Sequence, residues 1–223
     1  MTNTDTSTTD VNLPQLFGRE GSHYTRVARI FAHEAGLLPG KDFVFMPIAD
    51  LGNLDPSAYG GHPALKLPSL LTDEGVLTGT LNICRVFARD GARRLRVVWP
   101  EDGQGLLLAN AHELVAHTMQ TAVQLAFGTQ VARLDGENIY FRKARIGLHG
   151  ALGWIDGWLS AILAALPPRD LSFLEVSLFC AWEHLRFRNT LSLEGYPEIA
   201  AYAEKFGARA SAIATPYRFV PPI

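Results

Sequence analysis

The stretch that decides the fold runs from His62 to Ala88 and reads HPALKLPSLLTDEGVLTGTLNICRVFA. Its pattern predicts an apolar strand, a tight turn, a second strand and an amphipathic helix, with the first three at residues 67–72, 73–75 and 76–78. Pro68 stands at the mouth of the first strand, a place where proline is compatible with a sheet. The Leu67–Pro68 bond is a candidate for the cis isomer, which would leave neighbouring backbone groups free for a ligand.

The residues before this stretch predict the order strand, helix, strand, loop. The first strand is expected over residues 13–17, and Ser22 is placed as the N-cap of a helix that ends at Gly36. Residues 42–48 predict a second strand, and residues 50–64 are rich in turn-forming residues. Over about eighty residues this order predicts a small α/β unit in which a parallel pair is extended by an antiparallel hairpin.

The residues after the stretch predict helices only. Residues 108–125 and 148–166 each carry an apolar stripe at helical spacing, and the Ser172–Glu175 segment has the form of a capping box. Glycines within the second stripe are expected to let a neighbouring backbone approach closely, and three tryptophans in this half are expected in the core; these residues are Gly147, Gly150, Gly153, Gly157, Trp154, Trp158 and Trp182. The predicted organisation is a disordered tail, an α/β domain, a linker and an all-helical domain, over residues 1–12, 13–90, 91–104 and 105–223.

Composition narrows the class of protein. The chain has 223 residues, 48% of them hydrophobic and 19% charged, and a formal net charge of −2. These values fit a globular protein and leave no basic footprint for nucleic acid. No apolar run is long enough for a membrane span, and the polar N-terminus lacks a signal-peptide core. Two cysteines, Cys84 and Cys180, are too few for a disulfide framework, so the sequence favours the cytoplasm.

Five segments, taken in order, resemble the glutathione S-transferase family over nearly the whole chain. The first, Leu16–Gly18 with Ser22–Arg26, is similar to the family's first strand, turn and helix. The other four resemble its KVPxL segment, hairpin, S-x-A-D-I box and closing FxxRPS motif, at residues 66–70, 72–77, 172–176 and 206–211. The resemblance implies a thioredoxin-like α/β domain followed by an all-α helical bundle.

The resemblance also implies a ligand and a set of site residues. Glutathione would be the co-substrate, no metal would take part, and the protein would be a homodimer. Ser22 matches the position of the family's catalytic serine or cysteine. The residues implied for glutathione binding are Tyr24, Lys66, Leu67, Pro68, Gly79 and Thr80.

The sequence departs from the family at positions that matter for binding. Gly79 and Thr80 replace a Glu-Ser pair that holds the γ-glutamyl end of glutathione in the family. Thr80 keeps a hydroxyl and the helix N-terminus keeps its backbone donors, so a carboxylate can still dock there. Gly79 lacks the acidic partner for the ligand's ammonium group. His23 and His62 stand where the family commonly has proline and asparagine.

Ser22 has two interpretations. A serine hydroxyl at a helix N-terminus can stabilise a glutathione thiolate by hydrogen bonding, helped by the positive end of the helix dipole. The alternative is a simple N-cap, the commonest use of such a serine. Tyr24 likewise is either a second donor at the site or a core residue.

The second substrate is expected between the two domains. The residues predicted to line its pocket are Asn110, Glu113, His117 and Tyr217, although a polar residue on a helix usually belongs to a solvated face. His112, Glu113 and His117 resemble a zinc-protease box, but the histidines are five residues apart. Their rings therefore point about 140° apart on a helix, and a metal site is excluded.

The function that follows is a glutathione transferase acting on a hydrophobic electrophile. Two alternatives share the fold: a non-catalytic interaction module, favoured by Gly79, and a specialised glutathione-dependent lyase, isomerase or dehalogenase.

Overall fold

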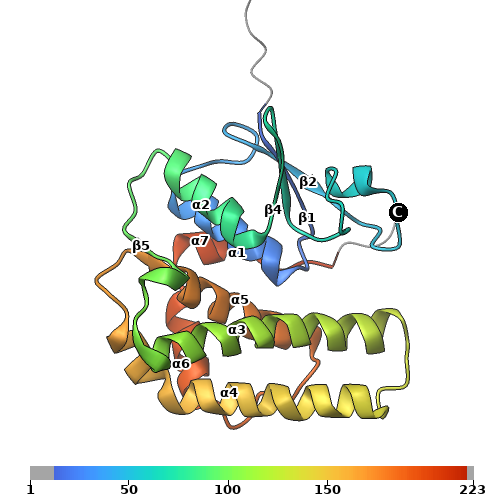
Figure 1. Ribbon diagram of the computed structural model, residues 1–223, viewed down its shortest axis with the longest axis vertical. Helices are drawn as coiled ribbons and strands as arrows, with labels where there is room; N and C mark the ends of the chain where they lie inside the picture. Colours follow the sequence, from blue (N-terminus) through green and yellow to red (C-terminus); the bar gives the residue numbers. More distant parts are fainter. Residues whose placement is uncertain (1–12, 220–223) are drawn as a thin grey trace, which may run out of the picture.

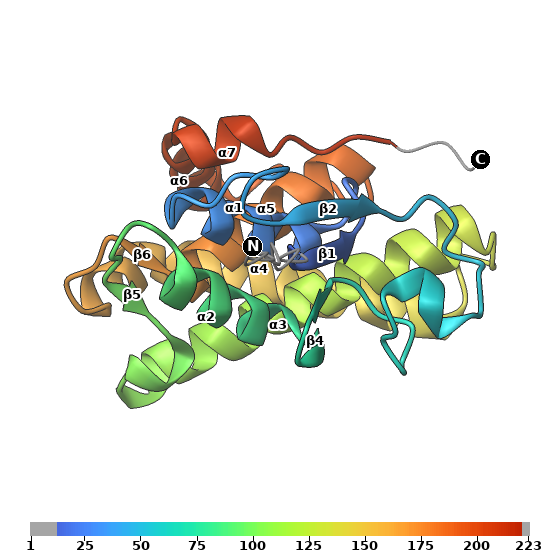
Figure 2. The same ribbon diagram turned by 90° about the horizontal axis from the view of Figure 1, so that it is seen from above.

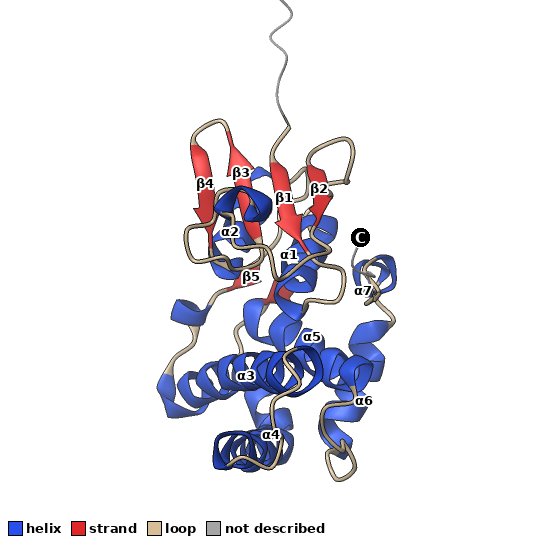
Figure 3. Cartoon of the chain, turned by 90° about the vertical axis from the view of Figure 1, so that its right-hand side faces the viewer, coloured by secondary structure: helices blue, strands red, loops and turns tan. Residues whose placement is uncertain are grey.

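The computed structural model describes residues 13–219, so the tail expected at residues 1–12 lies outside it. The first part is a four-stranded sheet with the order β2-β1-β3-β4 (Figures 1 and 3). The strands are β1 Gln15–Gly18, β2 Val44–Pro47, β3 Ser69–Thr72 and β4 Gly75–Thr78. β2 is parallel to β1, and β3 is antiparallel to β1 and to β4. The predicted parallel pair with an antiparallel hairpin is confirmed, and Leu67–Pro68 is cis.

Two helices pack with this sheet, α1 His23–Glu34 and α2 Thr80–Asp90, and a short helix, η1 Pro56–Tyr59, lies in the loop after β2. α1 contacts α2, and its other side contacts α5 and α7 of the second part. Burial on both sides explains why Val27, Ile30 and Phe31 are fully inaccessible to solvent. The N-terminus of α1 is therefore fixed between the two parts of the molecule.

The second part is mainly helical. Its elements are α3 Gly105–Leu125, the π-helical turn η3 Ala126–Val131, α4 Ile139–Ala165, α5 Phe173–Arg188, α6 Pro197–Gly207 and α7 Ala210–Ala214. α3 and α4 lie side by side and antiparallel (Figure 1), and α5 packs against α1, α3 and α6. After α7 the chain runs extended on the same side of the molecule as β2 (Figure 2).

A small second sheet joins the connecting segment to the helical part. β5 Val97–Val98 pairs in parallel with β6 Leu171–Ser172, and the short helix η2 Pro100–Asp102 follows β5. The sequence predicted no strand beyond residue 105, and this was wrong. A strand of two residues is too short to give an alternating pattern.

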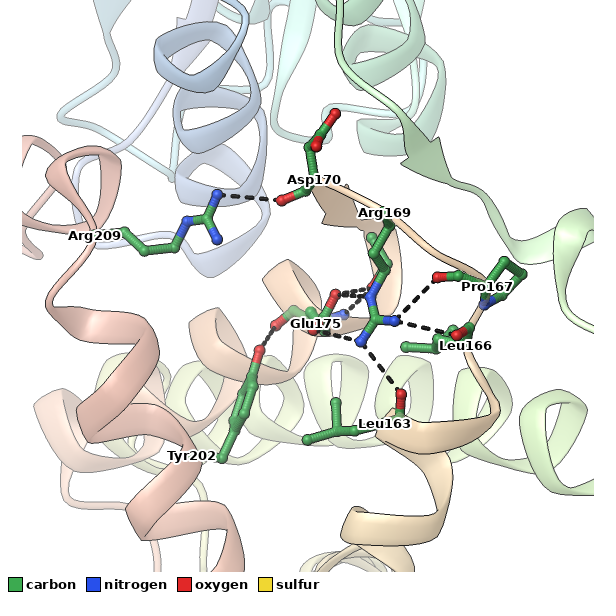
Figure 4. A network of polar contacts seen from close by, with 9 residues as sticks. Leu163, Leu166, Pro167, Arg169, Asp170, Glu175, Tyr202 and Arg209 are labelled. Carbon is green, nitrogen blue, oxygen red and sulfur yellow. Dashed lines mark hydrogen bonds and ion pairs between the residues drawn. The ribbon is translucent and has the colours of Figure 1, made fainter.

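Arg169 joins the end of α4 to the start of α5 (Figure 4). Its Nε and Nη2 donate to the Glu175 carboxylate at 2.6 and 2.9 Å. The remaining donors reach the backbone carbonyls of Leu163, Leu166 and Pro167. Ser172 is the N-cap of α5, since its Oγ accepts from the Glu175 N–H at 3.0 Å, as predicted. The Glu175 side chain accepts from the Ser172 hydroxyl at 2.7 Å, so the cap and the ion pair share one carboxylate.

Two expectations about α4 were wrong. At Gly147, Gly150 and Gly157 a Cβ would meet nothing within 4 Å among the described residues, so these glycines admit no neighbouring backbone. Trp158 is 52% exposed and does not belong to the core, whereas Trp182 is buried and Trp154 packs against the core. The glycines and Trp158 instead lie on an outer face of the helix.

Candidate functional site

Three segments meet at one end of the main sheet. Ser69 of β3 pairs with Phe17 of β1 on one side and with Thr78 of β4 on the other. The next residue along each strand in this register is Gly18 after β1, Pro68 before β3 and Gly79 after β4. The β1–α1 loop, the proline segment and the start of α2 are thereby placed next to one another, although up to sixty residues separate them in the chain.

Ser22 caps the N-terminus of α1, as predicted. Its Oγ accepts a hydrogen bond from the Thr25 N–H at 3.3 Å, and its own N–H donates to the Arg19 carbonyl at 3.0 Å. The residue is half-buried. No acceptor among residues 13–219 takes the hydroxyl proton, so the capping role leaves this proton available to a ligand. The two interpretations of Ser22 are therefore compatible.

The start of α2 leaves its backbone N–H groups open. Its N-cap is Gly79, with φ +89°, which makes no side-chain cap. The backbone N–H groups of Thr80, Leu81 and Asn82 have no acceptor among the described residues, and Thr80 is half-exposed. Free N–H groups at the positive end of a helix favour a carboxylate.

The proline segment presents backbone groups to the same place. Pro68 is buried, Leu67 is half-buried and Lys66 is exposed. Within residues 13–219, nothing hydrogen-bonds to the N–H or carbonyl of Leu67. The segment can therefore offer both a donor and an acceptor to an extended ligand, as a peptide-like molecule requires.

Tyr24 lies two residues beyond Ser22 and packs its ring against His23, with 4.4 Å between the ring centroids. Burial raises the pKa of the Tyr24 hydroxyl, which keeps it protonated as a donor. It also packs against the main core, so its role at the site stays a prediction.

The residues predicted for the second substrate are not gathered into one group. Asn110, Glu113 and His117 are exposed on α3, where His117 Nε2 lies 3.3 Å from a Glu113 oxygen. Tyr217 is engaged in packing, since its hydroxyl donates to the Cys180 carbonyl at 2.6 Å and Arg26 lies over its ring. Within residues 13–219, no three His, Cys, Asp or Glu side chains cluster in a way that could hold a metal.

A buried histidine pair lies beside the site, and no sequence pattern predicts it. His23 and His184 approach edge to face, with 4.4 Å between their ring centroids, and both are almost inaccessible to solvent. Burial lowers the pKa of His23 well below its usual value and that of His184 to about 3, and the charge of Arg188 adds to both shifts. The backbone of Met119 acts on His23 and that of Gly21 acts on His184, but within residues 13–219 no well-formed hydrogen bond reaches either nitrogen of His23 or Nδ1 of His184.

The histidine pair predicts acid sensitivity. In the folded protein His184 stays neutral down to about pH 3, whereas in the unfolded chain it takes up a proton near pH 6.5. The free energy of unfolding is therefore unaffected above pH 6.5 and falls as the pH drops toward 3, because the unfolded chain then binds one more proton than the folded protein. Each such histidine lowers the free energy of unfolding by about 1.4 kcal/mol per pH unit below about pH 6. Urea unfolding of the wild type and His184→Phe between pH 7 and pH 4.5 should show a shallower loss in the variant. His117→Gln, at an exposed position, should match the wild type, and parallel curves for His184→Phe would contradict this prediction.

Residues 16–93 match the model of the glutathione S-transferase N-terminal domain. A glutathione transferase family member from Pseudomonas fluorescens Pf-5, solved with bound glutathione, superimposes with a TM-score of 0.72 at 22% identity, covering 94% of this chain and 100% of that one. The same bacterial family member was also solved with S-(propanoic acid)-glutathione.

A maleylacetoacetate isomerase from Methylobacterium extorquens AM1, with bound malonate and glutathione, gives a TM-score of 0.68 at 16% identity, covering 93% of this chain and 98% of that one. No curated protein matches the sequence. None of the helices within residues 13–219 has the length and apolar character that a membrane span requires. The chain thus carries an N-terminal domain of the glutathione S-transferase family and, over nearly its whole length, the fold of that family.

Proposed function

We propose that the protein is a glutathione transferase that uses Ser22 to stabilise the glutathione thiolate. The observation that carries the proposal is the Ser22 hydroxyl, whose proton has no acceptor among the described residues while its oxygen caps α1. It lies at the same end of the sheet as the open start of α2 and the Leu67 backbone. Structural neighbours solved with bound glutathione support this assignment.

Each part of glutathione has a counterpart in this arrangement. The γ-glutamyl carboxylate would bind at the backbone N–H groups that start α2, with the Thr80 hydroxyl as a further donor. The cysteinyl backbone would pair with the N–H and carbonyl of Leu67, next to Pro68. Lys66 is exposed beside this segment and supplies a positive charge. Gly79 offers no acid for the ammonium group, which predicts weaker binding than an acidic residue would give.

The chemistry is thiolate attack. A hydroxyl donor and the positive end of α1 favour the thiolate over the thiol, and the thiolate is the nucleophile. Its sulfur forms a bond to the electrophilic carbon, the leaving group departs with its electron pair, and the thiol proton passes to solvent. Serine cannot form a mixed disulfide, so thiol-transfer chemistry is disfavoured. The neighbour solved with an S-substituted glutathione supports sulfur as the reacting atom.

Turnover tests the proposal. Glutathione and 1-chloro-2,4-dinitrobenzene should be converted by the wild type faster than in buffer alone, and S-methylglutathione should inhibit because it fills the same site without a free thiol. A rate equal to the buffer rate at millimolar glutathione, with no inhibition, would refute it.

A non-catalytic interaction module is the second candidate, and Gly79 is the observation that favours it. The position that carries an acid in the family has no side chain here and is exposed. A module of this kind would bind no glutathione, so a binding measurement separates the two functions.

We further propose a homodimer in the cytoplasm. Three large apolar side chains of α4, Ile139, Ile146 and Trp158, are each more than half exposed, and an interface that covers α4 would remove this apolar surface from water. Both cysteines are buried and unbonded, which suits a reducing compartment.

Trp158→Glu should therefore shift the protein from dimer to monomer in sedimentation velocity, since it places a charge in the proposed interface. Lys205→Glu, a charge change at an exposed position of α6 and outside the proposed surface of α4, is the control. A wild type that sediments as a monomer at every concentration would contradict the dimer.

A further inference from the structure

An arginine with no acidic partner in the described part of the chain lies beside the loop that carries Ser22. Arg188 is the last residue of α5 and is half-buried. A Cβ placed on Gly21 would lie 3.1 Å from Nη2 of Arg188, so the guanidinium borders the residue that directly precedes Ser22. The contact joins positions more than 160 residues apart in the chain.

No carboxylate within residues 13–219 forms an ion pair with Arg188. The acids of the surrounding elements act on other arginines: Glu183 on Arg186 at 2.8 Å, Glu20 on Arg29 at 3.8 Å, and Asp50 on Arg19. Nε of Arg188 is buried, and no acceptor in the part of the chain that the structure describes reaches it. Burial, and then the charge of Arg19, lower the pKa of Arg188. An anion that binds to a guanidinium in this position stabilises it, because charge-assisted hydrogen bonds to the anion replace the hydrogen bonds to water that burial removed.

The histidine pair does not compensate this charge. His23 and His184 lie next to Arg188, and its positive charge is one cause of their low pKa values. Both rings are therefore neutral near pH 7 and carry no negative charge. An anion at Arg188 would be the first negative group in this cluster.

Aromatic rings lie beside the same guanidinium. The Arg188 Cζ atom is 5.3 Å from the ring centroid of Phe187 and 5.2 Å from that of Phe219. The two rings stack on each other with 4.2 Å between centroids, and Phe219 is 67% exposed. The exposed ring offers a flat apolar surface to whatever binds at Arg188.

We propose that Arg188 binds an anionic group of the second substrate, and that the preferred electrophile is a flat, conjugated carboxylate. This proposal rests on the proposed function, since it places the carboxylate at Arg188 and the reacting carbon near the sulfur at Ser22. With an aryl chloride, the sulfur–carbon bond forms, the carbon–chlorine bond breaks, chloride leaves with the electron pair and the thiol proton goes to solvent. It narrows the general expectation of a hydrophobic electrophile to one that also carries a negative charge.

Binding without chemistry is the first test. Calorimetric titration of the full chain, without glutathione, compares 3,5-dinitrobenzoate with neutral 3,5-dinitrobenzamide, neither of which has a leaving group. The benzoate should bind about tenfold to a hundredfold more tightly, as expected for a charge-assisted hydrogen bond. Arg188→Gln should abolish the preference, and Arg188→Lys should keep part of it, because an ammonium lacks the planar fork. Arg186→Gln removes an equal charge from an exposed position of α5 and should leave the preference unchanged.

Turnover is the second test. With glutathione, 4-chloro-3,5-dinitrobenzoate should be preferred over its amide by a similar factor in kcat/KM, relative to the uncatalysed rates. Equal binding of the benzoate and the amide by the wild type, or a preference that survives in Arg188→Gln, would overturn the inference. If Arg188→Gln does not fold, salt decides: the wild-type preference should fall with ionic strength, and a salt-independent preference counts against it. An Arg188-dependent preference without any glutathione turnover would refute the proposed function and leave the anion site standing.

Discussion

Ser22→Ala is expected to lower kcat/KM for glutathione conjugation by about a hundredfold. The variant loses a hydroxyl at the N-terminus of α1 whose proton has no acceptor within residues 13–219, and loss of one preorganised donor to a developing or stabilised anion typically has an effect of this size. The bound glutathione thiol should also titrate at a higher pH in the variant, because the thiolate has lost its donor. Steady-state kinetics and thiolate absorbance of the complex measure the two effects.

Two further variants separate catalysis from helix capping. Ser22→Thr keeps both the hydroxyl and the cap, so it should retain most of the activity. Asn138 is the N-cap of α4, and its side chain accepts a hydrogen bond from the Tyr140 N–H. Asn138→Ala therefore removes a helix cap that lies outside the proposed site. It should lower the free energy of unfolding by about 1 kcal/mol and leave kcat/KM unchanged. Equal kcat/KM for Ser22→Ala and the wild type would show that Ser22 is only a cap.

Arg169→Met is expected to lower the free energy of unfolding by about 3–5 kcal/mol. The substitution leaves the Glu175 carboxylate, about four-fifths buried, without its bidentate partner, and it removes donors from three backbone carbonyls at the end of α4. Exposed arginine pairs have much smaller effects, about 0–1 kcal/mol. Urea unfolding measures the difference.

Arg186→Met is the matched control, since its partner Glu183 lies on the same helix and its own side chain is 64% exposed. Little change is expected there. If the two variants lose the same small amount of stability, the Arg169 network does not hold α4 to α5 in the way described.

The fold was predictable because its signals are local. Pro68 at the mouth of a strand, Ser22 before one apolar stripe and Ser172 before another each depend on a few adjacent residues, and the structure confirms all three placements. β5 and β6 were not predictable, since two-residue strands exist only through pairing between segments more than seventy residues apart.

The site was predictable only in part. Ser22, Pro68 and the start of α2 follow from sequence patterns, and sheet register brings them together. Arg188 and His184 reach the same place through the packing of α5 on α1, which leaves no trace in the spacing of residues. Their position near Ser22 depends on tertiary packing alone.

The backbone of Gly79 has a conformation that disfavours any side chain, which affects a test of the missing acid. Gly79→Glu would restore the acid that the family carries, but φ is +89° at this position. A non-glycine residue there is strained by about 1–2 kcal/mol, so the variant combines a gain in ligand binding with a loss in stability. Affinity and the free energy of unfolding must be measured together.

Calorimetric titration of the full chain with glutathione tests whether the ends of β1, β3 and β4 form a glutathione site. We expect saturable heat at millimolar glutathione with one molecule per chain, competition by S-methylglutathione, and binding that persists in Ser22→Ala, since the α2 start and Leu67 backbone hold the peptide. The absence of saturable heat at millimolar glutathione would contradict it.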